Sequence, residues 1–480
     1  IATPTSYHFA LDKASISHLI ITNRPMLRRG FIAIFNLTSV SGTPAITQRT
    51  AGSGFIANPP AAFFTRRFLS KSPIVMSSAT LHSIPPEHIP AGMTVHVNKP
   101  FLPTSVSEIE KLGSKKVFVV ANRSSVKFIE GDGRLIQTLE SKDLLAAPVC
   151  TSIGMGGGEE GLLQACDAAY ECGADCILTV GGGAVQDAGK LIRLWLTTKD
   201  NGDVAEASSA AASVEGIQAA QKQDPMPALH PQIAVPNSFA MAEATKVAGL
   251  TTKANTKSGA AHEDMIPNVL IYDPALSAGL PDWVRFGTAL RGIEHAVGAV
   301  THPKSNEDIR SRALTGLAIL KENIEKLKET PECSVAQSNV YVGGFMAIRA
   351  LNTGCYPALG HLVENQYSAR FGVHQGSCSG ILCARIMDSH YEKSEELQKR
   401  ISAAMGDAST PAPRLVRDLA GSLPGVSHEH TQVNVTDDML GEFTQWMFDN
   451  HLPRYNSLSP KGFSRVDDIL GMMTKPLDKL

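Results

Sequence analysis

The segment 180–190 constrains the fold of this chain more than any other. It reads Val-Gly-Gly-Gly-Ala-Val-Gln-Asp-Ala-Gly-Lys and continues a short apolar run, 174–180, that is typical of a buried strand. Glycines between a strand and a helix form a turn whose N–H groups can approach phosphate oxygens closely, at the positive end of the helix. The segment predicts a phosphate-binding turn in an α/β domain; the alternative is a plain strand-to-helix turn.

Length and composition indicate a globular protein of more than one domain. The chain has 480 residues, of which 43% are hydrophobic and 19% charged, and its formal net charge is -2. Such a balance gives no reason to expect a nucleic-acid partner. The apolar runs, such as 30–40, are shorter than the roughly 20 residues that cross a bilayer. We expect a small-molecule substrate, no membrane span, and possible homodimers.

Eight cysteines are scattered through the chain without a CxxC pair, at 150, 166, 172, 176, 333, 355, 378 and 383. They read as reduced thiols of an intracellular protein. A metal cluster at Cys166, Cys172 and Cys176 is the alternative, but the spacing favours cysteines packed in a helix and a strand.

Residues 1–86 have the composition of a targeting or disordered leader. They contain one acid, Asp12, against basic residues at 13, 24, 28, 29, 49, 66, 67 and 71. Arginine-rich, acid-poor leaders are typical of mitochondrial import, so the leader predicts a mitochondrial protein; a secretory reading of 26–45 is weaker. The true start could also be Met26 or Met76; if it is Met76, the leader disappears and the protein is instead expected in the cytoplasm.

From about residue 87 the chain alternates between predicted strands and helices. The expected strands are 115–122, 176–180, 232–236 and 269–272, with helices over 159–172 and 187–197 between them. Strands separated by helices predict a parallel sheet with right-handed crossovers. After 274 helical periodicity dominates, over 283–300, 306–330, 335–352, 360–371, 376–391, 395–405, 440–450 and 466–473. We predict an α/β Rossmann-like nucleotide-binding domain over 87–274 and an all-α domain over 275–480.

Several motifs in order resemble one family. The run Gly181 to Lys190 resembles the GGGSxxDxxK signature of the iron-containing alcohol dehydrogenase superfamily, with Ala184 in the place of serine. The segments 236–243, 257–259 and 269–281 resemble the maleylacetate reductase branch. The resemblance covers roughly residues 100–475. It implies the fold of dehydroquinate synthase-like and iron-type alcohol dehydrogenases.

The resemblance also implies a set of cofactor-binding residues. Around the pyrophosphate and ribose it places Gly181, Gly182, Gly183, Asp187 and Lys190. The 236–243 loop, with Ser238 and Phe239, would flank the nicotinamide. At the end of the first strand, where relatives carry an acid that favours NAD, this chain has Asn122-Arg123-Ser124. Arg123 could pair with a 2′-phosphate or be a solvated loop residue, so the cofactor is NADPH or NADH, with a slight preference for NADPH.

The metal ligands implied by the family are largely replaced. His295 matches one ligand, but the position of the aspartate is Arg291, one helical turn earlier. A later histidine falls on Pro357 and another on Gln375, while His361 matches a histidine beside the nicotinamide. The Arg291 guanidinium would repel a metal ion bound by His295, and arginine has no lone pair with which to coordinate a metal. The sequence argues against catalytic iron or zinc; if a metal binds, His295 and His374 are the expected ligands.

These expectations define a function and its alternatives. The predicted protein is an NAD(P)H-dependent oxidoreductase that acts on a carbonyl, alcohol or oxo-acid alkene of a small acidic substrate, similar to maleylacetate reductases. Arg291 would replace the charge of the metal, with His295 and His361 as donors or relays; the alternative is that Arg291 forms a structural pair with Glu294 or Glu364. Other readings are an iron- or zinc-dependent alcohol dehydrogenase with a remodelled site, a non-redox lyase or cyclase, and a nucleotide-binding pseudoenzyme.

Overall fold

The computed structural model describes residues 80–479, apart from 132–133, 155–156, 201–210, 223–225 and 254–256. Residues 73–480 form one compact unit. The predicted leader lies outside the described residues as far as residue 79. From Thr80 onward the chain is part of the folded unit, because the Asn339 side chain donates to the Thr80 carbonyl and accepts from the His82 N–H. The last residues of the predicted leader therefore belong to the fold.

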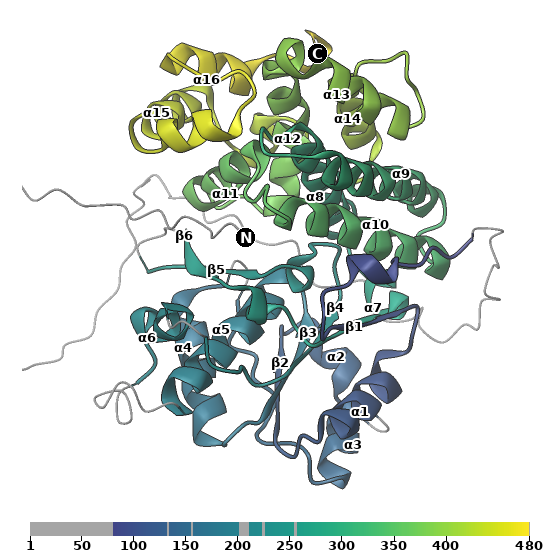
Figure 1. The fold of residues 1–480 in the computed structure, drawn as a ribbon, viewed down its shortest axis with the longest axis vertical. Helices are drawn as coiled ribbons and strands as arrows, with labels where there is room; N and C mark the ends of the chain where they lie inside the picture. The colour runs from purple at the N-terminus through teal and green to yellow at the C-terminus, as the bar shows by residue number, and fades with distance from the viewer. Residues whose placement is uncertain are drawn as a thin grey trace, which may run out of the picture. The chain divides into compact units, whose positions relative to one another are not determined.

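A parallel five-stranded sheet forms the first half of the compact unit (Figure 1). Its strand order is β1-β7-β4-β3-β2, and every pair is parallel. Four strands are buried along their whole length, as the apolar sequence runs predicted. The strands are β1 Thr94–Val97, β2 Val117–Ala121, β3 Cys176–Gly181, β4 Gln232–Pro236 and β7 Val269–Tyr272.

Helices connect most of the parallel strands, and α7 follows the last of them. They are α1 Phe101–Leu112, α2 Val126–Ile129, α3 Leu135–Ser141, α4 Glu159–Glu171, α5 Gly183–Asp200, α6 Val214–Ala219 and α7 Pro274–Ala278. The predicted helix at 187 begins earlier, at Gly183, because the glycine turn itself supplies its first residues. Between β4 and β7 lies an antiparallel hairpin, β5 Val247–Thr251 with β6 Lys257–Ala261.

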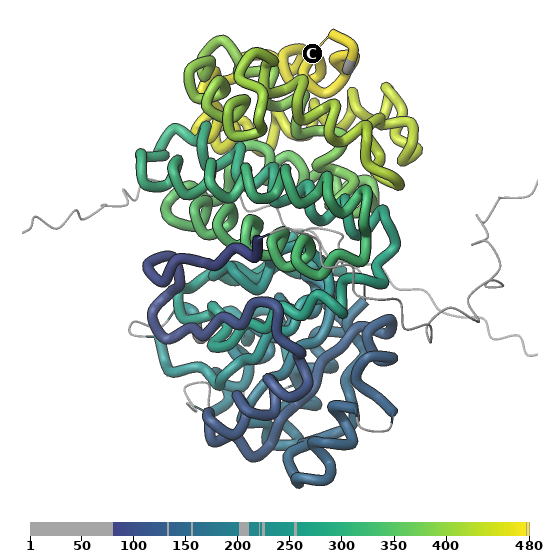
Figure 2. The backbone as a smooth tube through the Cα atoms, turned by 90° about the vertical axis from the view of Figure 1, so that its right-hand side faces the viewer, coloured from purple at the N-terminus to yellow at the C-terminus, as the bar shows by residue number. Residues whose placement is uncertain are grey.

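Among the described residues, every named element after β7 is a helix (Figures 1 and 2). The larger ones are α8 Asp282–Thr301, α9 Glu307–Glu329, α10 Ser334–Asn352, α11 Leu359–Phe371, α12 Gln375–Ser389, α13 Tyr391–Ala404, α14 Ala412–Ser422, α15 Asp437–Leu458 and α16 Val466–Thr474. The predicted fold class is thereby confirmed. The change to helices falls where the sequence placed the boundary, near 274, although both parts lie within one compact unit.

Helix α8 is the central helix of this second half. It packs against α9, α10, α11 and α12. Two glycines allow this close approach: a Cβ on Gly287 would lie 3.2 Å from the backbone of Gly376, and one on Gly292 would lie 2.9 Å from Leu320. Most residues of α8 are therefore buried, including the charged residues Arg285, Arg291 and Glu294. No helix among the described residues is long and apolar enough to be a membrane span.

Candidate active site

The glycine turn lies beside the carboxyl ends of three strands. Gly181 ends β3 and Gly183 begins α5. A Cβ on Gly181 would lie 2.5 Å from Asn122 Oδ1, after β2, and one on Gly183 would lie 3.3 Å from Ala240 Cβ, after β4. A side chain at either position would press on a neighbouring loop. The turn thus lies at the edge where the parallel strands end, which is the usual ligand-binding edge of such sheets.

Asn122 is held within its own loop. Its Oδ1 accepts from the Ser125 hydroxyl at 2.5 Å, and its amide donates to Ser124 Oγ. The Asn237 amide donates to the same Ser125 hydroxyl at 2.9 Å. The loops after β2 and β4 are therefore tied together beside the glycine turn. Arg123 is exposed next to this network, so its guanidinium is accessible at the end of β2.

Lys190 has a structural position rather than one facing a ligand. Its ammonium is fully buried and contacts Asp187 Oδ1 at 3.2 Å, the Ala242 carbonyl at 2.6 Å and the Val247 carbonyl at 2.7 Å, with Thr245 Oγ1 at 3.1 Å. An ammonium has three protons, so no donor remains for a phosphate. To make the predicted contact with the cofactor, Lys190 would have to give up one of these contacts. The lysine instead ties α5 to the chain that enters β5.

Asp187 links the same helix to the hairpin and remains partly accessible. Its Oδ2 accepts from the Gly249 N–H at 3.0 Å, and its side chain is 21% exposed. Of the two polar residues that the family signature places after the glycines, Asp187 is thus the one still available to a ligand.

In the loop after β4, one residue lies at the glycine turn and the next lies in the core. Ser238 is buried with its Oγ close to Gly182, where a Cβ would lie 3.4 Å from it. Phe239 points away: its ring packs edge-on against Tyr341, with centroids 4.7 Å apart, and its N–H donates to Thr288 Oγ1 at 3.1 Å. Phe239 therefore anchors the loop to the helical half, which corrects its predicted place beside the nicotinamide.

The predicted catalytic residues do come together. Arg291 and His295 lie one turn apart on α8, and His361 lies on α11. Arg291 Nη2 is 3.4 Å from His361 Nδ1, and the two imidazole centroids are 5.4 Å apart. The other nitrogen of His361, Nε2, lies 3.0 Å from the Tyr356 hydroxyl. The result is a buried polar cluster formed by α8, α11 and the loop before α11.

Arg291 also forms an ion pair in this cluster. Its Nη1 donates to Glu364 Oε2 at 3.2 Å, and the Ser379 hydroxyl donates to the same oxygen at 2.7 Å. The structural pairing that the sequence left open is therefore present, with Glu364 and not Glu294 as the partner. The pair does not use the whole guanidinium, since Nη2 faces His361. Arg291 can be both a structural and a reactive group.

Burial sets the protonation states of the cluster. It lowers the pKa of His295 and of His361 well below the usual range, and the charge of Arg291 lowers both further. Both imidazoles are therefore neutral at ordinary pH. Burial raises the pKa of Glu294 to about 7, against the opposing effect of Arg291, and raises the pKa of Glu364 well above its usual range. Glu364 Oε2 receives hydrogen bonds from Arg291 and Ser379, which oppose the effect of burial on the pKa of this carboxyl.

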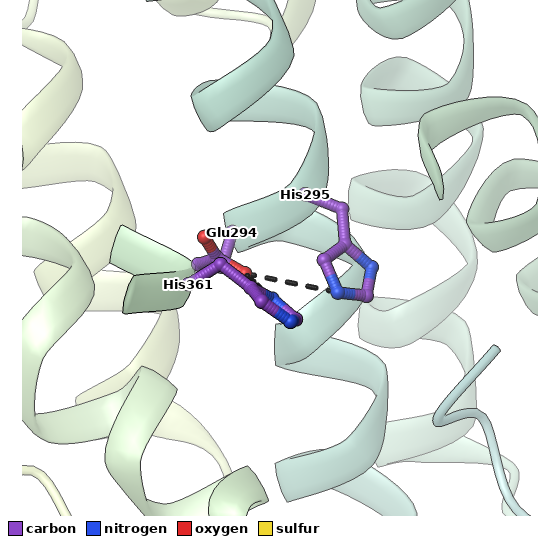
Figure 3. A group of neighbouring side chains, drawn as sticks. All are labelled: Glu294, His295 and His361. Carbon is purple, nitrogen blue, oxygen red and sulfur yellow. Dashed lines mark ion pairs between the residues drawn. The ribbon is translucent and has the colours of Figure 1, made fainter. Parts of the chain in front are cut away.

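Glu294, His295 and His361 are the residues that could face a common metal ion (Figure 3). Glu294 Oε2 lies 3.7 Å from His295 Nε2 and 3.5 Å from His361 Nδ1, and spacings of this size suit ligands about 2 Å from one ion. However, His361 Nδ1 is also the atom that faces the Arg291 guanidinium. A divalent ion there would lie beside a fixed positive charge, so this arrangement does not fit the family's resident metal.

The other expected metal ligand lies elsewhere. His374 caps α12 by accepting the Gly376 N–H at Nδ1, 3.2 Å away, and its ring packs edge-on against Trp283. Burial lowers its pKa to about 4. Gln375 donates to Asn365. Within the described ranges, the group of potential ligands around His295 includes His361 and Glu294 in place of His374.

Sequence reasoning missed three residues of the site. Tyr356 and Glu294 contact the histidines, and Lys257 of β6 lies half-buried with its ammonium 2.8 Å from Thr251 Oγ1. Burial lowers the pKa of Lys257. The charge of Asp187 raises this pKa and the charge of Arg291 lowers it, so both halves of the site act on the lysine. Glu294 had a signal, since it adjoins His295. Lys257 lies in the 257–259 segment of the family resemblance, but hairpin geometry decides what it faces. Tyr356 had no signal, because loop geometry places it.

Comparisons with known proteins agree with this fold. Residues 96–274 match the family model of the iron-containing alcohol dehydrogenases. A maleylacetate reductase of Burkholderia cepacia is 23% identical over 319 residues, which cover 66% of this chain and 78% of that protein. One from Rhizobium sp. strain MTP-10005 is 25% identical over 239 residues, covering 50% of this chain and 57% of that protein. The crystal structure of maleylacetate reductase from that Rhizobium strain has a TM-score of 0.63 at 19% identity, covering 81% of this chain and 96% of that chain.

These observations first indicate the class of protein. A parallel-sheet domain with a glycine turn, joined to a helical domain and matching this family model, supports the assignment as an NAD(P)-dependent oxidoreductase. The family follows from the sequence matches. These matches support a place in the iron-containing alcohol dehydrogenase superfamily, near its maleylacetate reductase branch.

Proposed function

We propose that this protein is a reductase that uses NAD(P)H to reduce a carbonyl, or the alkene of an oxo acid, in a small acidic substrate. The observation that carries the proposal is the position of Arg291, whose guanidinium lies beside His361 where the family would have a metal. A fixed positive charge in a buried site can hold a substrate carboxylate or stabilise a developing alkoxide. The similarity to maleylacetate reductases makes maleylacetate the first substrate to test.

Each residue of the cluster has a distinct part in this proposal. The glycine turn would hold the pyrophosphate of NAD(P)H, whose nicotinamide would supply the hydride. Arg291 orients the oxygen or carboxylate of the substrate, and Lys257 adds a second positive charge from the hairpin. The Tyr356 hydroxyl, hydrogen-bonded to His361, is placed to give a proton to the product oxygen. Burial keeps both histidines neutral, so that they can take and give protons.

The test is the loss of reduced-nicotinamide absorbance when the full chain is mixed with NADPH or NADH and a panel of oxo acids and neutral aldehydes. We expect turnover with oxo acids and much less with neutral aldehydes. Cofactor binding without any turnover would point instead to the non-redox lyase or cyclase, or to a pseudoenzyme.

A second candidate is a metal-dependent alcohol dehydrogenase with a remodelled site. The spacing of Glu294, His295 and His361 favours it. We expect the reductase to keep its activity after dialysis against a chelator and to gain none from added Fe²⁺ or Zn²⁺, because Arg291 repels a cation. Activity that disappears with the chelator and returns with one of these metals would establish the second candidate. Metal analysis of the purified protein provides the control.

The cofactor preference can be tested at Arg123. If its exposed guanidinium pairs with the 2′-phosphate, Arg123→Glu raises the Kd of NADPH about 10- to 100-fold, the effect of losing a hydrogen bond to a charged group. The Kd of NADH should change far less. Lys127→Glu is the matched control, since this exposed lysine is a few residues further along the same connection. Equal effects on both cofactors would assign Arg123 to the solvated loop.

A further inference from the structure

The ion pair between Arg291 and Glu364 uses only one oxygen of the carboxyl group. Arg291 Nη1 donates to Glu364 Oε2 at 3.2 Å, while the other oxygen, Oε1, is buried and has no hydrogen-bond partner. The second terminal nitrogen of the guanidinium, Nη2, faces His361 Nδ1 at 3.4 Å. Arginine–carboxylate pairs are frequently bidentate, with two nitrogens on two oxygens. In this protein the pair leaves Nη2 without a carboxylate partner.

The hydroxyl of Ser379 accounts for this geometry. It donates to Glu364 Oε2 at 2.7 Å, the same oxygen that receives Arg291. Because Oε1 has no partner, the two donors at Oε2 determine how the carboxyl group is oriented. A bidentate pair would require the carboxyl group to turn Oε1 toward Nη2, and this rotation would break the hydrogen bond with Ser379. Both side chains are buried, at 2% exposure for Ser379 and 0% for Glu364, so bulk water does not replace that bond.

The packing of α8 against α12 brings the hydroxyl to this oxygen. A Cβ on Gly287 would lie 3.2 Å from the backbone of Gly376, so the two helices are in close contact there. Arg291 follows Gly287 by four residues and Ser379 follows Gly376 by three, so each lies one turn beyond the contact, on the same face of its helix. Glu364 of α11 lies between them and contacts both.

We propose that Ser379 is a positioning residue that holds the Arg291–Glu364 pair on one oxygen and thereby keeps Arg291 Nη2 free for the acidic substrate. The inference rests on the proposed reductase function. Ser379 acts through Glu364 and does not touch the substrate. Without the hydroxyl, the carboxylate can turn and pair with both Nη1 and Nη2. The positive charge that orients the substrate is then bound by the protein itself.

This role predicts that stability and activity respond differently to the loss of the hydroxyl. A serine that only stabilised the fold would lower the Tm when replaced by alanine and would leave the kinetics unchanged. In Ser379→Ala the bidentate pair replaces the lost hydrogen bond, and such charge-assisted pairs are the stronger contacts. We therefore expect this variant to keep the Tm of the wild type and to lose affinity for acidic substrates.

The first test is the steady-state kinetics of Ser379→Ala with NADPH, oxo acids and neutral aldehydes. We expect KM for oxo acids to rise about 10-fold, the effect of losing one hydrogen bond to a charged group, with little change in kcat, in the Kd of NADPH or in the aldehyde kinetics. Ser379→Thr keeps a hydroxyl and should restore the KM. Ser338→Ala removes a buried hydroxyl of α10 that has no partner, and this matched control should behave as wild type. A folded Ser379→Ala protein with wild-type KM would overturn the proposal, as would a lower Tm with unchanged kinetics.

A second substitution tests whether Ser379 acts through Glu364. Glu364→Gln removes the negative charge that would attract Nη2, so Ser379→Ala should change KM far less in this background than in the wild type. Equal effects of Ser379→Ala in the two backgrounds would show that the hydroxyl acts by another route, and the proposal would be wrong.

A crystal structure of Ser379→Ala separates this inference from the proposed function. We expect Glu364 to contact both Nη1 and Nη2 of Arg291, and Nη2 to move away from His361. A pair that still uses one oxygen would overturn the inference even if the enzyme is an active reductase. Absence of NAD(P)H turnover in the wild type would instead overturn the reductase function, and with it the role of Nη2 in substrate binding, whatever geometry the variant shows.

Discussion

Arg291→Leu should lower kcat/KM for an oxo acid about 100- to 1000-fold, the usual effect of removing one group that stabilises developing negative charge. The substitution removes the only fixed positive charge in contact with His361 among the described residues. Steady-state kinetics with NADPH and maleylacetate measure the effect. Neutral aldehydes, which lack a carboxylate to orient, should lose less.

The ion pair with Glu364 complicates this variant, and a second substitution resolves it. Removing one partner of a buried pair costs roughly 3–5 kcal/mol of stability, so Arg291→Leu should also unfold more readily. In Arg291→Leu combined with Glu364→Gln the orphaned carboxylate is gone, and Ser379 can still donate to the amide oxygen. We expect the double variant to recover most of the stability and none of the activity. Recovery of both would show that Arg291 is only structural.

Lys190→Met should be the most destabilising single change at the cofactor side. The methionine fills much of the same volume but removes the ammonium donor from Asp187 and from the carbonyls of Ala242 and Val247, for which one Thr245 hydroxyl proton remains. Loss of a buried charge partner costs about 3–5 kcal/mol, and thermal unfolding of the full chain measures it.

The affinity for NADPH distinguishes the two roles of this lysine. If Lys190 is structural, the protein that remains folded at low temperature binds NADPH with a Kd close to that of wild type. A variant that is as stable as wild type but binds NADPH at least tenfold more weakly would show that Lys190 contacts the cofactor phosphates. Asp187→Asn is a useful comparison, because it keeps an acceptor for Gly249 and removes the charge.

Much of the fold could be predicted because buried segments have a recognisable hydrophobic pattern in the sequence. The four fully buried strands are apolar runs, and the long helices carry a clear periodicity. Strand β1 was missed because it lies at the sheet edge, is only half-buried and contains Thr94 and His96. The β5–β6 hairpin was missed because Gly249 and Gly259 interrupt its pattern, with Gly259 allowing close contact with the Ala248 carbonyl.

The site was predictable where its residues share one helix and not where they depend on distant loops. His295 and Arg291 are one turn apart, so their common face followed from helical spacing. Lys190 and Phe239 were misplaced because a motif fixes their position in the chain but not which of several nearby surfaces their side chains contact. The orientation of Glu294, with Oε2 toward the histidines and Oε1 on the other side, depends on the glycines at 298 and 360. No local pattern encodes it.

The contacts of Lys190 and Asp187 have a mechanical consequence. Both side chains connect α5 to the hairpin, through Val247 and Gly249 of β5. The glycine turn and the hairpin must therefore move as one rigid body, and Lys257 on β6 moves with them. Any closure of the site on a substrate is then a displacement of this body against α8 and α11, which carry Arg291 and His361. Cofactor bound at the turn would thus set the distance between Lys257 and Arg291, the two positive charges proposed to hold an acidic substrate.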